Sequence, residues 1–220
     1  MNQFEEKFVN KIICGDCLEV MKDWPDKCIG LTITSPPYGV GIEYSSSIDL
    51  IPDYWDLVNR VSEMSIILPG YKNHYHLPIP VVTAIWHKPN SCTGGACLSR
   101  WAVWEPIMFY GSWGGKRLYE RDIFTIPIRV QPEANGHPCP FPLELIIELL
   151  EPIDKNLILD PFCGSGTTCV AAKMLGHRFI GIDISPEYCE IARQRLESVD
   201  TGVPVKEARQ GQQPLFPVNS

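Results

Sequence analysis

The sequence predicts a single α/β domain, in which helices cover both faces of a doubly wound, mainly parallel sheet. Three observations favour this fold class. Short apolar segments rich in β-branched residues alternate with segments of helical period. A length of 220 residues with 45% apolar residues suits one domain with a substantial core. Two apolar segments end in motifs of glycine, proline and acidic residues, at the position where open parallel sheets bind ligands.

The first half of the chain alternates expected strands and helices. Four short apolar runs are expected to be strands: 11–14, 29–34, 81–86 and 103–110. Two stretches with helical spacing are expected to be helices: 17–22 and 53–67. Pro36 and Pro37 have no N–H group to continue a sheet, so the second strand must stop before them. We expect 71–80 to be irregular and 111–131 to be an exposed binding loop.

The second half of the chain carries the clearest helix signals. Pro142 at a first helical turn starts a helix to Leu150, with a buried stripe of Leu145, Ile146, Leu149 and Leu150. An apolar strand then leads into Leu159–Thr168, which reads LDPFCGSGTT, and a helix follows until Gly176.

The last strand is expected at 178–183. Ser185 and Pro186 cap the last helix, which should bury Tyr188, Ile191, Ala192 and Leu196. These elements form a domain over 1–200, and the polar segment 201–220 is expected to be a flexible tail.

Charge is unevenly distributed along the chain. The net charge is −7, but the window 86–130 carries +3 and the rest −10. A basic face on an acidic body is typical of a protein that docks a phosphate backbone on one side, although an ordinary solvated surface explains the charges equally well. Region 90–135 is therefore a candidate for nucleic-acid recognition.

Composition also bears on location and metal binding. No apolar run approaches a membrane span and the N-terminus lacks a secretory signal, so a cytosolic protein with reduced cysteines is expected. Cys14 and Cys17, with Cys92 and Cys97, could form a four-thiolate zinc site, but their spacing does not match a zinc ribbon. We expect small buried side chains instead, and no metal.

The glycine turn in LDPFCGSGTT indicates a nucleotide-like or carboxylate-bearing ligand. Its glycines let a ligand approach the backbone, and the free N–H groups of the next helix favour negative charge. Asp16, Asp160 and Asp183 each follow a strand, and Asp183 comes 17 residues after Gly166, near the spacing of a ribose-binding acid. The absence of a G-K-[ST] triplet argues against a phosphate-cradling NTPase loop.

Taken together, the motifs resemble those of the beta group of amino-group DNA methyltransferases. DPFCGSGTT resembles the S-adenosylmethionine motif of that family, and Thr34–Tyr38 (TSPPY) resembles its catalytic motif. Gly15–Glu19 (GDCLE) resembles the motif for the cofactor adenine, and His137–Pro142 (HPCPFP) resembles the motif that closes the methionine end of the pocket. The resemblance covers about 10–200, and the motifs stand in the order of the permuted beta group. It implies a Rossmann-like class I methyltransferase fold with a small inserted recognition region.

The resemblance also implies a mechanism. The target base must be flipped out of duplex DNA to expose its amine. Tyr38 would stack on that base, while Ser35 and the carbonyl of Pro36 or Pro37 would accept its N–H groups. No covalent intermediate is needed, so neither Cys28 nor Cys163 need be a nucleophile. Serine before Pro-Pro-Tyr favours the 4-amino group of cytosine, and the 6-amino group of adenine is the alternative.

The remaining residues of the expected site fall into two sets. The cofactor would be held by Asp16, Phe141, Asp160, Phe162, Gly164, Ser165, Gly166, Thr167 and Asp183. DNA would be contacted by Lys88, Arg100, Lys116, Arg117, Arg121 and Arg129.

Two departures leave alternatives open. Only 68–80 remains where the family usually has another strand and helix, so a catalytically silent DNA-binding protein is conceivable. Gln212–Phe216 resembles the peptide that docks on the bacterial sliding clamp, although a disordered end explains it as well. An RNA or protein-amide methyltransferase could use the same fold, and a nicotinamide-dependent oxidoreductase could use the glycine turn, which would leave TSPPY unexplained.

Overall fold

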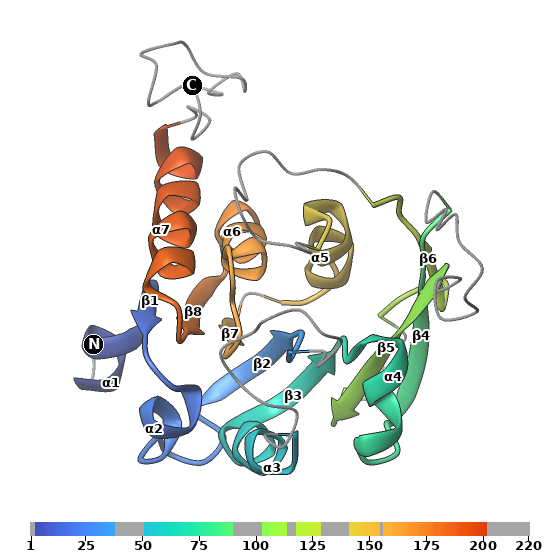
Figure 1. Cartoon of the computed structure of the whole chain (residues 1–220), viewed down its shortest axis with the longest axis horizontal. Helices are drawn as coiled ribbons and strands as arrows, with labels where there is room; N and C mark the ends of the chain where they lie inside the picture. The colour runs from blue at the N-terminus through green and yellow to red at the C-terminus, as the bar shows by residue number, and fades with distance from the viewer. Residues whose placement is uncertain are drawn as a thin grey trace.

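The computed structural model describes residues 3–37, 51–89, 103–113, 118–128, 141–154 and 156–201. Within them, a central sheet is sandwiched between two layers of helices (Figure 1). The strands are β1 (Lys11–Cys14), β2 (Ile29–Thr34), β3 (Ser62–Ile67), β4 (Val82–His87), β5 (Trp104–Gly111), β6 (Ile123–Thr125), β7 (Leu157–Asp160) and β8 (Arg178–Asp183). The helices are α1 (Gln3–Phe8), α2 (Cys17–Met21), α3 (Ile51–Val61), α4 (Gly70–Asn73), the 3-10 turn η2 (His74–His76), α5 (Leu143–Leu150), α6 (Thr167–Met174) and α7 (Pro186–Thr201).

The strand order is β1-β8-β7-β2-β3-β5-β4-β6, and the first five of these strands run parallel. Strand β5 is antiparallel to both β3 and β4, and β6 is parallel to β4. From β7 the chain continues to β8 on one side, whereas from β2 it continues to β3 on the other. The carboxyl ends of β7 and β2 therefore meet at the topological switch point, where sheets of this kind bind ligands. The predicted fold class is confirmed.

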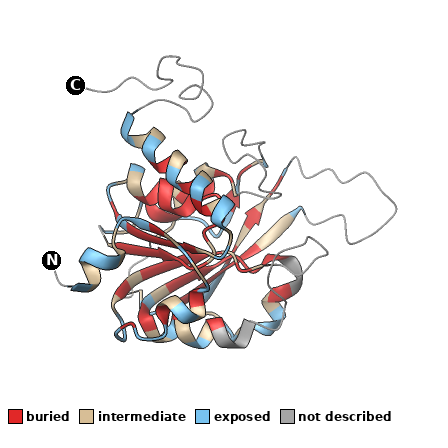
Figure 2. Cartoon of the chain, turned by 60° about the vertical axis from the view of Figure 1, so that its left-hand side comes forward, coloured by how far each residue is buried: buried red, intermediate tan, exposed pale blue. Residues whose placement is uncertain are grey.

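Each face of the sheet has its own hydrophobic core. Helices α5, α6 and α7 cover one face, and α2 and α3 cover the other (Figure 1). Figure 2 shows that the strands between them are largely buried along their length. The stripe predicted for α5 is confirmed, since Leu145, Ile146, Leu149 and Leu150 are all buried. In the described part of the chain, no helix is long and apolar enough to cross a membrane.

The helix predicted over 53–67 was wrong in its second half. Helix α3 ends at Val61, and β3 begins at the next residue and pairs in parallel with β2. Met64 and Ile66 fit a helical spacing by coincidence, and the sequence contains no glycine or proline to mark the boundary. The strand that seemed to be missing from the chain is therefore β3. Where the further helix was expected, the chain has only α4 and the turn η2 before β4.

Two further expectations need correction. Segment 71–80 is irregular only in part, because α4 and η2 occupy its first residues. Within 111–131, the described residues are not simply an exposed loop, since β6 extends the sheet and buries Phe124. Ile126 is buried as well, and Tyr119 packs against the same core. Phe124 and Ile126, two positions apart, therefore point into the core, and the segment that contains them belongs to the sheet.

The last helix buries a slightly different face from the one predicted. Ala192 and Leu196 are buried as expected, but the stripe also includes Cys189 and Arg195. Tyr188 and Ile191 are only half-buried. The expected start is confirmed, since α7 begins at Pro186 and the Tyr188 N–H donates to the Ser185 hydroxyl. The tail 202–220 lies outside the described residues.

Close packing of β8 against its neighbours gives a stability prediction. A Cβ atom added at Gly181 would lie 2.6 Å from Ile12 Cδ1 and 2.8 Å from Cys169 Sγ. We expect Gly181→Ala to lower the free energy of unfolding by about 1–3 kcal/mol in urea denaturation, because both neighbours must move. Gly15→Ala is the control, because its Cβ would meet the end of the Val20 side chain at a milder 3.1 Å. Equal stability of Gly181→Ala and wild type would contradict this packing.

Candidate functional site

The two sequence motifs meet at the carboxyl ends of β2 and β7. These strands are parallel neighbours, with Thr32 opposite Leu159. Two residues further along β2, the Thr34 hydroxyl donates a hydrogen bond of 2.7 Å to Asp160 Oδ1. Thr34 is 1% exposed and Asp160 is 5% exposed, so water does not compete for this bond. The residue that begins the TSPPY motif is thereby fixed to the acid that begins the glycine turn.

Beyond Thr34, the chain leaves the sheet as expected. The Thr34 carbonyl accepts a hydrogen bond of 2.9 Å from the Leu68 N–H, which is the last described backbone link of this strand to its neighbour. Ser35 and Pro37 are half-buried and Pro36 is buried. Tyr38 lies outside the described residues. The structure thus places the first three residues of the predicted catalytic set beside the glycine turn.

The glycine turn is held by one backbone bond to β8 and one within the turn itself. The Cys163 N–H donates to the carbonyl of Ile182 at 2.9 Å, and the Gly166 N–H donates to the carbonyl of Cys163 at 2.7 Å. Gly166 has φ of 82°, which is a left-handed conformation that favours glycine. The turn delivers Thr167 to the start of α6. The N-terminus of α6, where the first N–H groups have no partner within the helix, therefore lies at the carboxyl ends of the strands, as Ser35 does.

Burial and hydrogen bonding have opposite effects on the pKa of Asp160. Desolvation by burial raises its pKa from 3.8 to about 6, and hydrogen bonds from Thr34, Thr168 and the Phe162 N–H oppose that rise. The Phe162 bond measures 3.1 Å and ends on the same oxygen as the Thr34 bond. The carboxyl group is therefore held in one orientation by both motifs.

Asp183 and Asp16 stand at the ends of the next two strands. Asp183 accepts the Gly164 N–H on one carboxylate oxygen and the Ser185 N–H on the other, both at 2.8 Å. Burial raises its pKa, and these two donors oppose the rise. Asp16 is exposed and caps α2 by accepting the Leu18 N–H at 2.8 Å. Each carboxylate keeps lone pairs for hydroxyl or amine donors of a ligand.

Phe162 and Phe141 sit on opposite faces of the sheet. The Phe162 ring meets the ring of Tyr54 edge-on at 5.3 Å and packs against the α2/α3 core. Phe141 lies just before α5 and packs against Trp86 at 5.6 Å. Residues 137–140 of the HPCPFP motif lie outside the described residues.

Cys163 and Cys28 both have thiols whose pKa is raised. Cys163 is buried in the turn, and burial raises the pKa of its thiol well above the usual range. Burial also raises the pKa of Cys28. Both side chains are therefore thiols rather than thiolates at neutral pH. Among the described residues, no group of three or more His, Cys, Asp or Glu side chains could hold a metal ion, and Cys92 and Cys97 are not among them.

The basic residues predicted to contact DNA are largely outside the described ranges. These are Arg100, Lys116, Arg117 and Arg129. Lys88 is described, but it is 5% exposed and its ammonium is 2.6 Å from a Glu105 carboxylate oxygen. It is a buried ion pair, held over the Trp86 ring, rather than an exposed phosphate contact.

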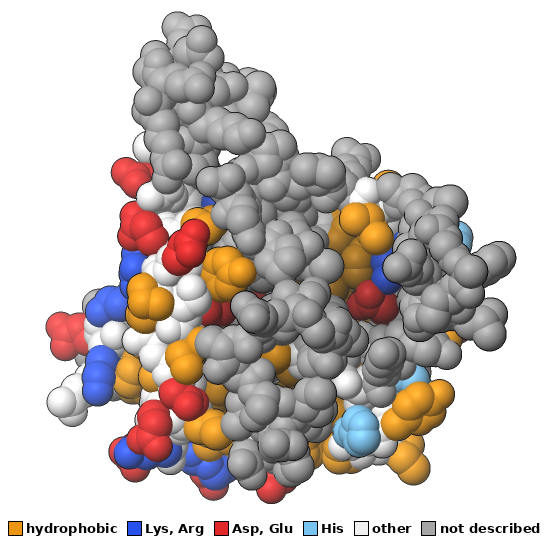
Figure 3. Space-filling model, viewed as in Figure 1, with side chains coloured by type: hydrophobic (Ala, Val, Ile, Leu, Met, Phe, Trp, Pro, Cys, Tyr) orange, Lys and Arg blue, Asp and Glu red, His pale blue; other side chains and the backbone are white. Residues whose placement is uncertain are grey.

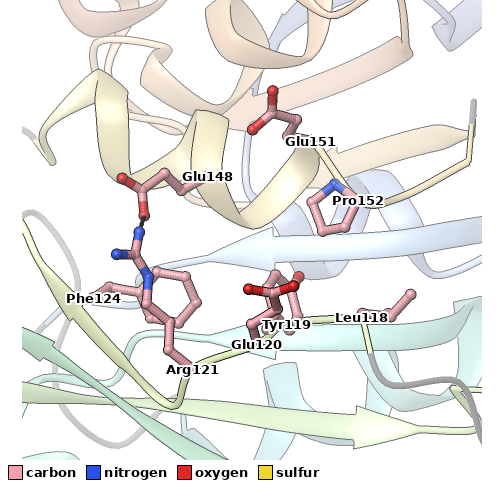
Figure 4. Close-up of a pocket in the computed structure, with 8 residues that line it drawn as sticks. All are labelled: Leu118, Tyr119, Glu120, Arg121, Phe124, Glu148, Glu151 and Pro152. Atoms are coloured by element: carbon pink, nitrogen blue, oxygen red, sulfur yellow. Dashed lines mark hydrogen bonds and ion pairs between the residues drawn. The ribbon is translucent and has the colours of Figure 1, made fainter.

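Arg121 is exposed and pairs with Glu148 across an open cavity of about 390 Å³ (Figure 4). Arg121 precedes β6, which runs in the same direction as β2, so it lies near the amino ends of these strands. Ser35 lies at their carboxyl ends. Figure 3 shows acidic and basic side chains mixed over α1, α2 and α7 rather than separated by sign. The described residues thus carry little of the expected basic face.

The fold and the site together define a class of protein. The sheet has one antiparallel strand in an otherwise parallel order, and acids stand on three neighbouring strand ends beside a glycine turn. This is the arrangement of class I methyltransferases. A family model for DNA methylases that modify N6 or N4 amino groups matches residues 80–194, which is more than half of the chain. The chain belongs to this family of DNA methyltransferases.

Known proteins of similar sequence and structure agree with this assignment. The type II methyltransferase M.ScaI of Streptomyces caespitosus is 26% identical over 84% of this chain and 80% of its own. The DNA modification methylase TTHA0409 of Thermus thermophilus superimposes with a TM-score of 0.65, at 27% identity over 84% of this chain and 94% of its own. That protein has also been solved with S-adenosyl-L-methionine. PvuII DNA methyltransferase, titled cytosine-N4-specific, shares the fold at a TM-score of 0.65 and 18% identity, over 91% of this chain and 93% of its own.

The comparisons also decide between earlier alternatives. The resemblance to amino-group DNA methyltransferases is confirmed, and the oxidoreductase alternative is excluded by the family. They give no support for a sliding-clamp partner, and Gln212–Phe216 lies outside the described residues. Sequence reasoning gave no role to Thr34, although it lies in the TSPPY motif, or to Arg195, whose Nη1 donates to the Ser165 carbonyl and the Thr167 hydroxyl. Thr34 could have been found from its place next to Ser35, but nothing in the sequence marks Arg195.

The bond between the motifs predicts a specific effect of Thr34→Val. Thr32→Val is the matched control, because Thr32 on the same strand makes a buried bond of 2.6 Å to Ser62. Each substitution should lower the free energy of unfolding by about 1–3 kcal/mol, since each removes a hydrogen bond from a buried polar partner. Only Thr34→Val should also lower the rate of methyl transfer. Equal rates in the two variants, measured at a temperature where both are folded, would contradict the role of this bond.

The raised pKa of Asp160 predicts a pH dependence of stability. Its pKa is about 6 in the fold against 3.8 ordinarily, so the folded state binds more protons between these values. The contribution of this group to stability is therefore fully present below about pH 4 and is lost as the pH rises to about 6. The loss is at most about 3 kcal/mol.

Asp160→Asn isolates this effect, because Asp183 also titrates in wild type. Urea denaturation of both proteins between about pH 4 and 7 should show wild type losing stability relative to Asp160→Asn as the pH rises. A constant difference between the two across this range would show that the pKa of Asp160 is not raised.

Proposed function

We propose that this chain transfers a methyl group from S-adenosylmethionine to the 4-amino group of cytosine in duplex DNA, with the target base flipped out of the helix. The observation that carries the proposal is the Thr34–Asp160 hydrogen bond. It sets the start of the serine-proline-proline-tyrosine motif beside the glycine turn at the switch point of the sheet. Ser35, as the residue before Pro-Pro, favours cytosine over adenine.

The donor set at the turn suits S-adenosylmethionine. Its carboxylate would meet the backbone N–H groups of Ser165 and Thr167, which donate to no other described residue, at the start of α6. Its amino group would face Asp160. Asp183 would accept a ribose hydroxyl with the lone pairs that the Gly164 and Ser185 N–H groups leave available. Asp16, on the next strand end, would take the adenine amine.

The chain's own residues would orient the target amine. When bound, S-adenosylmethionine supplies a methyl group on a positively charged sulfur, so no activation of the donor is required. Tyr38 would stack on the flipped base. Ser35 Oγ and the carbonyl of Pro36 or Pro37 would accept the two N–H groups of the amine and turn its lone pair toward the methyl group. The buried Thr34 keeps this acceptor pair in register with the cofactor turn.

The same geometry can serve the 6-amino group of adenine, because both bases present an exocyclic amine with two N–H groups. Adenine is therefore the second candidate. One assay separates the two: the protein is incubated with labelled S-adenosylmethionine and unmodified duplex DNA, the DNA is digested to nucleosides, and the product is identified by mass. N4-methylcytosine as the product supports the proposal, whereas N6-methyladenine shows that the target base is adenine. No transfer by a protein that binds the cofactor contradicts the proposal.

Two sets of variants should separate catalysis from cofactor binding. Ser35→Ala and Tyr38→Ala should lower kcat at least about 100-fold while the Kd for S-adenosylmethionine stays within about twofold. Asp183→Ala should instead raise that Kd, because the ribose loses its acceptor and the Gly164 N–H loses its partner. Tyr75→Ala is a control, since Tyr75 is exposed on η2. Full activity of Ser35→Ala or unchanged affinity of Asp183→Ala would refute the corresponding assignment.

A further inference from the structure

Helix α7 supports the glycine turn from behind through a buried arginine. The Arg195 side chain is 3% exposed, and its Nη1 donates to three oxygens of the turn. These are the Ser165 carbonyl at 2.8 Å, the Ser165 hydroxyl at 3.0 Å and the Thr167 hydroxyl at 3.0 Å. One guanidinium nitrogen therefore ties together the two residues that flank Gly166.

Burial of this arginine is costly unless the turn keeps this shape. Arginine is almost never fully buried unless it is paired or hydrogen-bonded, and it cannot shed its charge. Its planar group presents donors in fixed directions, so the acceptors must be correctly placed. The arginine thus selects one conformation of the Ser165–Thr167 segment.

The same face of α7 contacts the site at two further points. A Cβ atom at Gly166 would lie 2.7 Å from the Cβ of Ala192, which is one helical turn before Arg195. One turn earlier still, the Cys189 thiol donates to the Asp183 carbonyl at 3.4 Å. Residues at positions i, i+3 and i+6 therefore support the end of β8 and both sides of the glycine turn, and Figure 1 shows α7 beside α6 on the same face of the sheet.

We propose that Arg195 is a positioning residue for the cofactor. It fixes the turn so that the backbone N–H groups of Ser165 and Thr167 point to the carboxylate of S-adenosylmethionine, and its positive charge lies just behind them. The Ser165 and Thr167 hydroxyls then accept hydrogen bonds from Arg195 and do not bind the cofactor, which contacts the backbone of the turn instead. This inference rests on the proposed cofactor site.

The test compares Arg195→Met, which keeps the length of the side chain but no donor, with Arg195→Lys and wild type. Arg193→Met is the matched control, because Arg193 is exposed on the same helix and donates to Ile12 of β1 rather than to the turn. Affinity for S-adenosylmethionine is measured by isothermal titration calorimetry, together with kcat, the KM for each substrate and thermal stability.

We expect Arg195→Met to raise the Kd and KM for S-adenosylmethionine at least about tenfold, with the KM for DNA within about twofold of wild type. Arg195→Lys should restore part of the affinity, and Arg193→Met should bind as wild type does. An Arg195→Met protein that is less stable but binds with wild-type affinity would overturn the inference, since Arg195 would then be only structural.

A second variant keeps the inference testable if Arg195→Met does not fold. Thr167→Val removes one of the three acceptors and leaves the arginine in place. It should raise the Kd several-fold, and an unchanged Kd would overturn the inference. If wild type itself binds no S-adenosylmethionine, the proposed function fails. If wild type binds it and either Arg195→Met or Thr167→Val binds with the same affinity, only the role of Arg195 is refuted.

Discussion

The hydrogen bond between Thr34 and Asp160 is the interaction on which the rest of the site depends. It lies in the core at the point where the sheet changes winding direction, and it links residues 126 positions apart in the sequence. On one side of the bond the chain enters the rest of the TSPPY motif at Ser35, and on the other it enters the glycine turn. Because the bond is buried, water cannot replace either partner when the bond breaks. A shift of either loop that breaks it therefore costs free energy.

The acids of the site are held by donors supplied by other parts of the site. Asp160 receives Thr34 and the Phe162 N–H, while Asp183 receives N–H groups from the glycine turn and from the start of α7. Arg195 holds the same turn from the opposite side. The turn is therefore fixed before any ligand arrives, which reduces the entropy that binding must overcome. A methyl transfer that depends chiefly on alignment benefits from such a preorganised site.

Much of this could be predicted from the sequence, because its signals are local. Apolar β-branched runs located β1, β2 and β8 to the residue, and the leucine and isoleucine stripe located α5. The boundary between α3 and β3 could not be predicted, since no turn residue separates them and the apolar spacing suits both. The burial of Lys88 was equally hidden, because it depends on Glu105 in a neighbouring strand. The contacts that assemble the site also lay beyond the sequence, since Thr34 meets Asp160, and Arg195 meets Thr167, only after the sheet and its covering helices have formed.

The most direct test of this arrangement is an experimental structure of the protein with S-adenosylmethionine. We predict the carboxylate of the cofactor at the N–H groups of Ser165 and Thr167, its ribose at Asp183, and its methyl group facing Ser35. The cofactor bound elsewhere, or bound here with its methyl group turned away from Ser35, would contradict the proposed alignment of the two motifs.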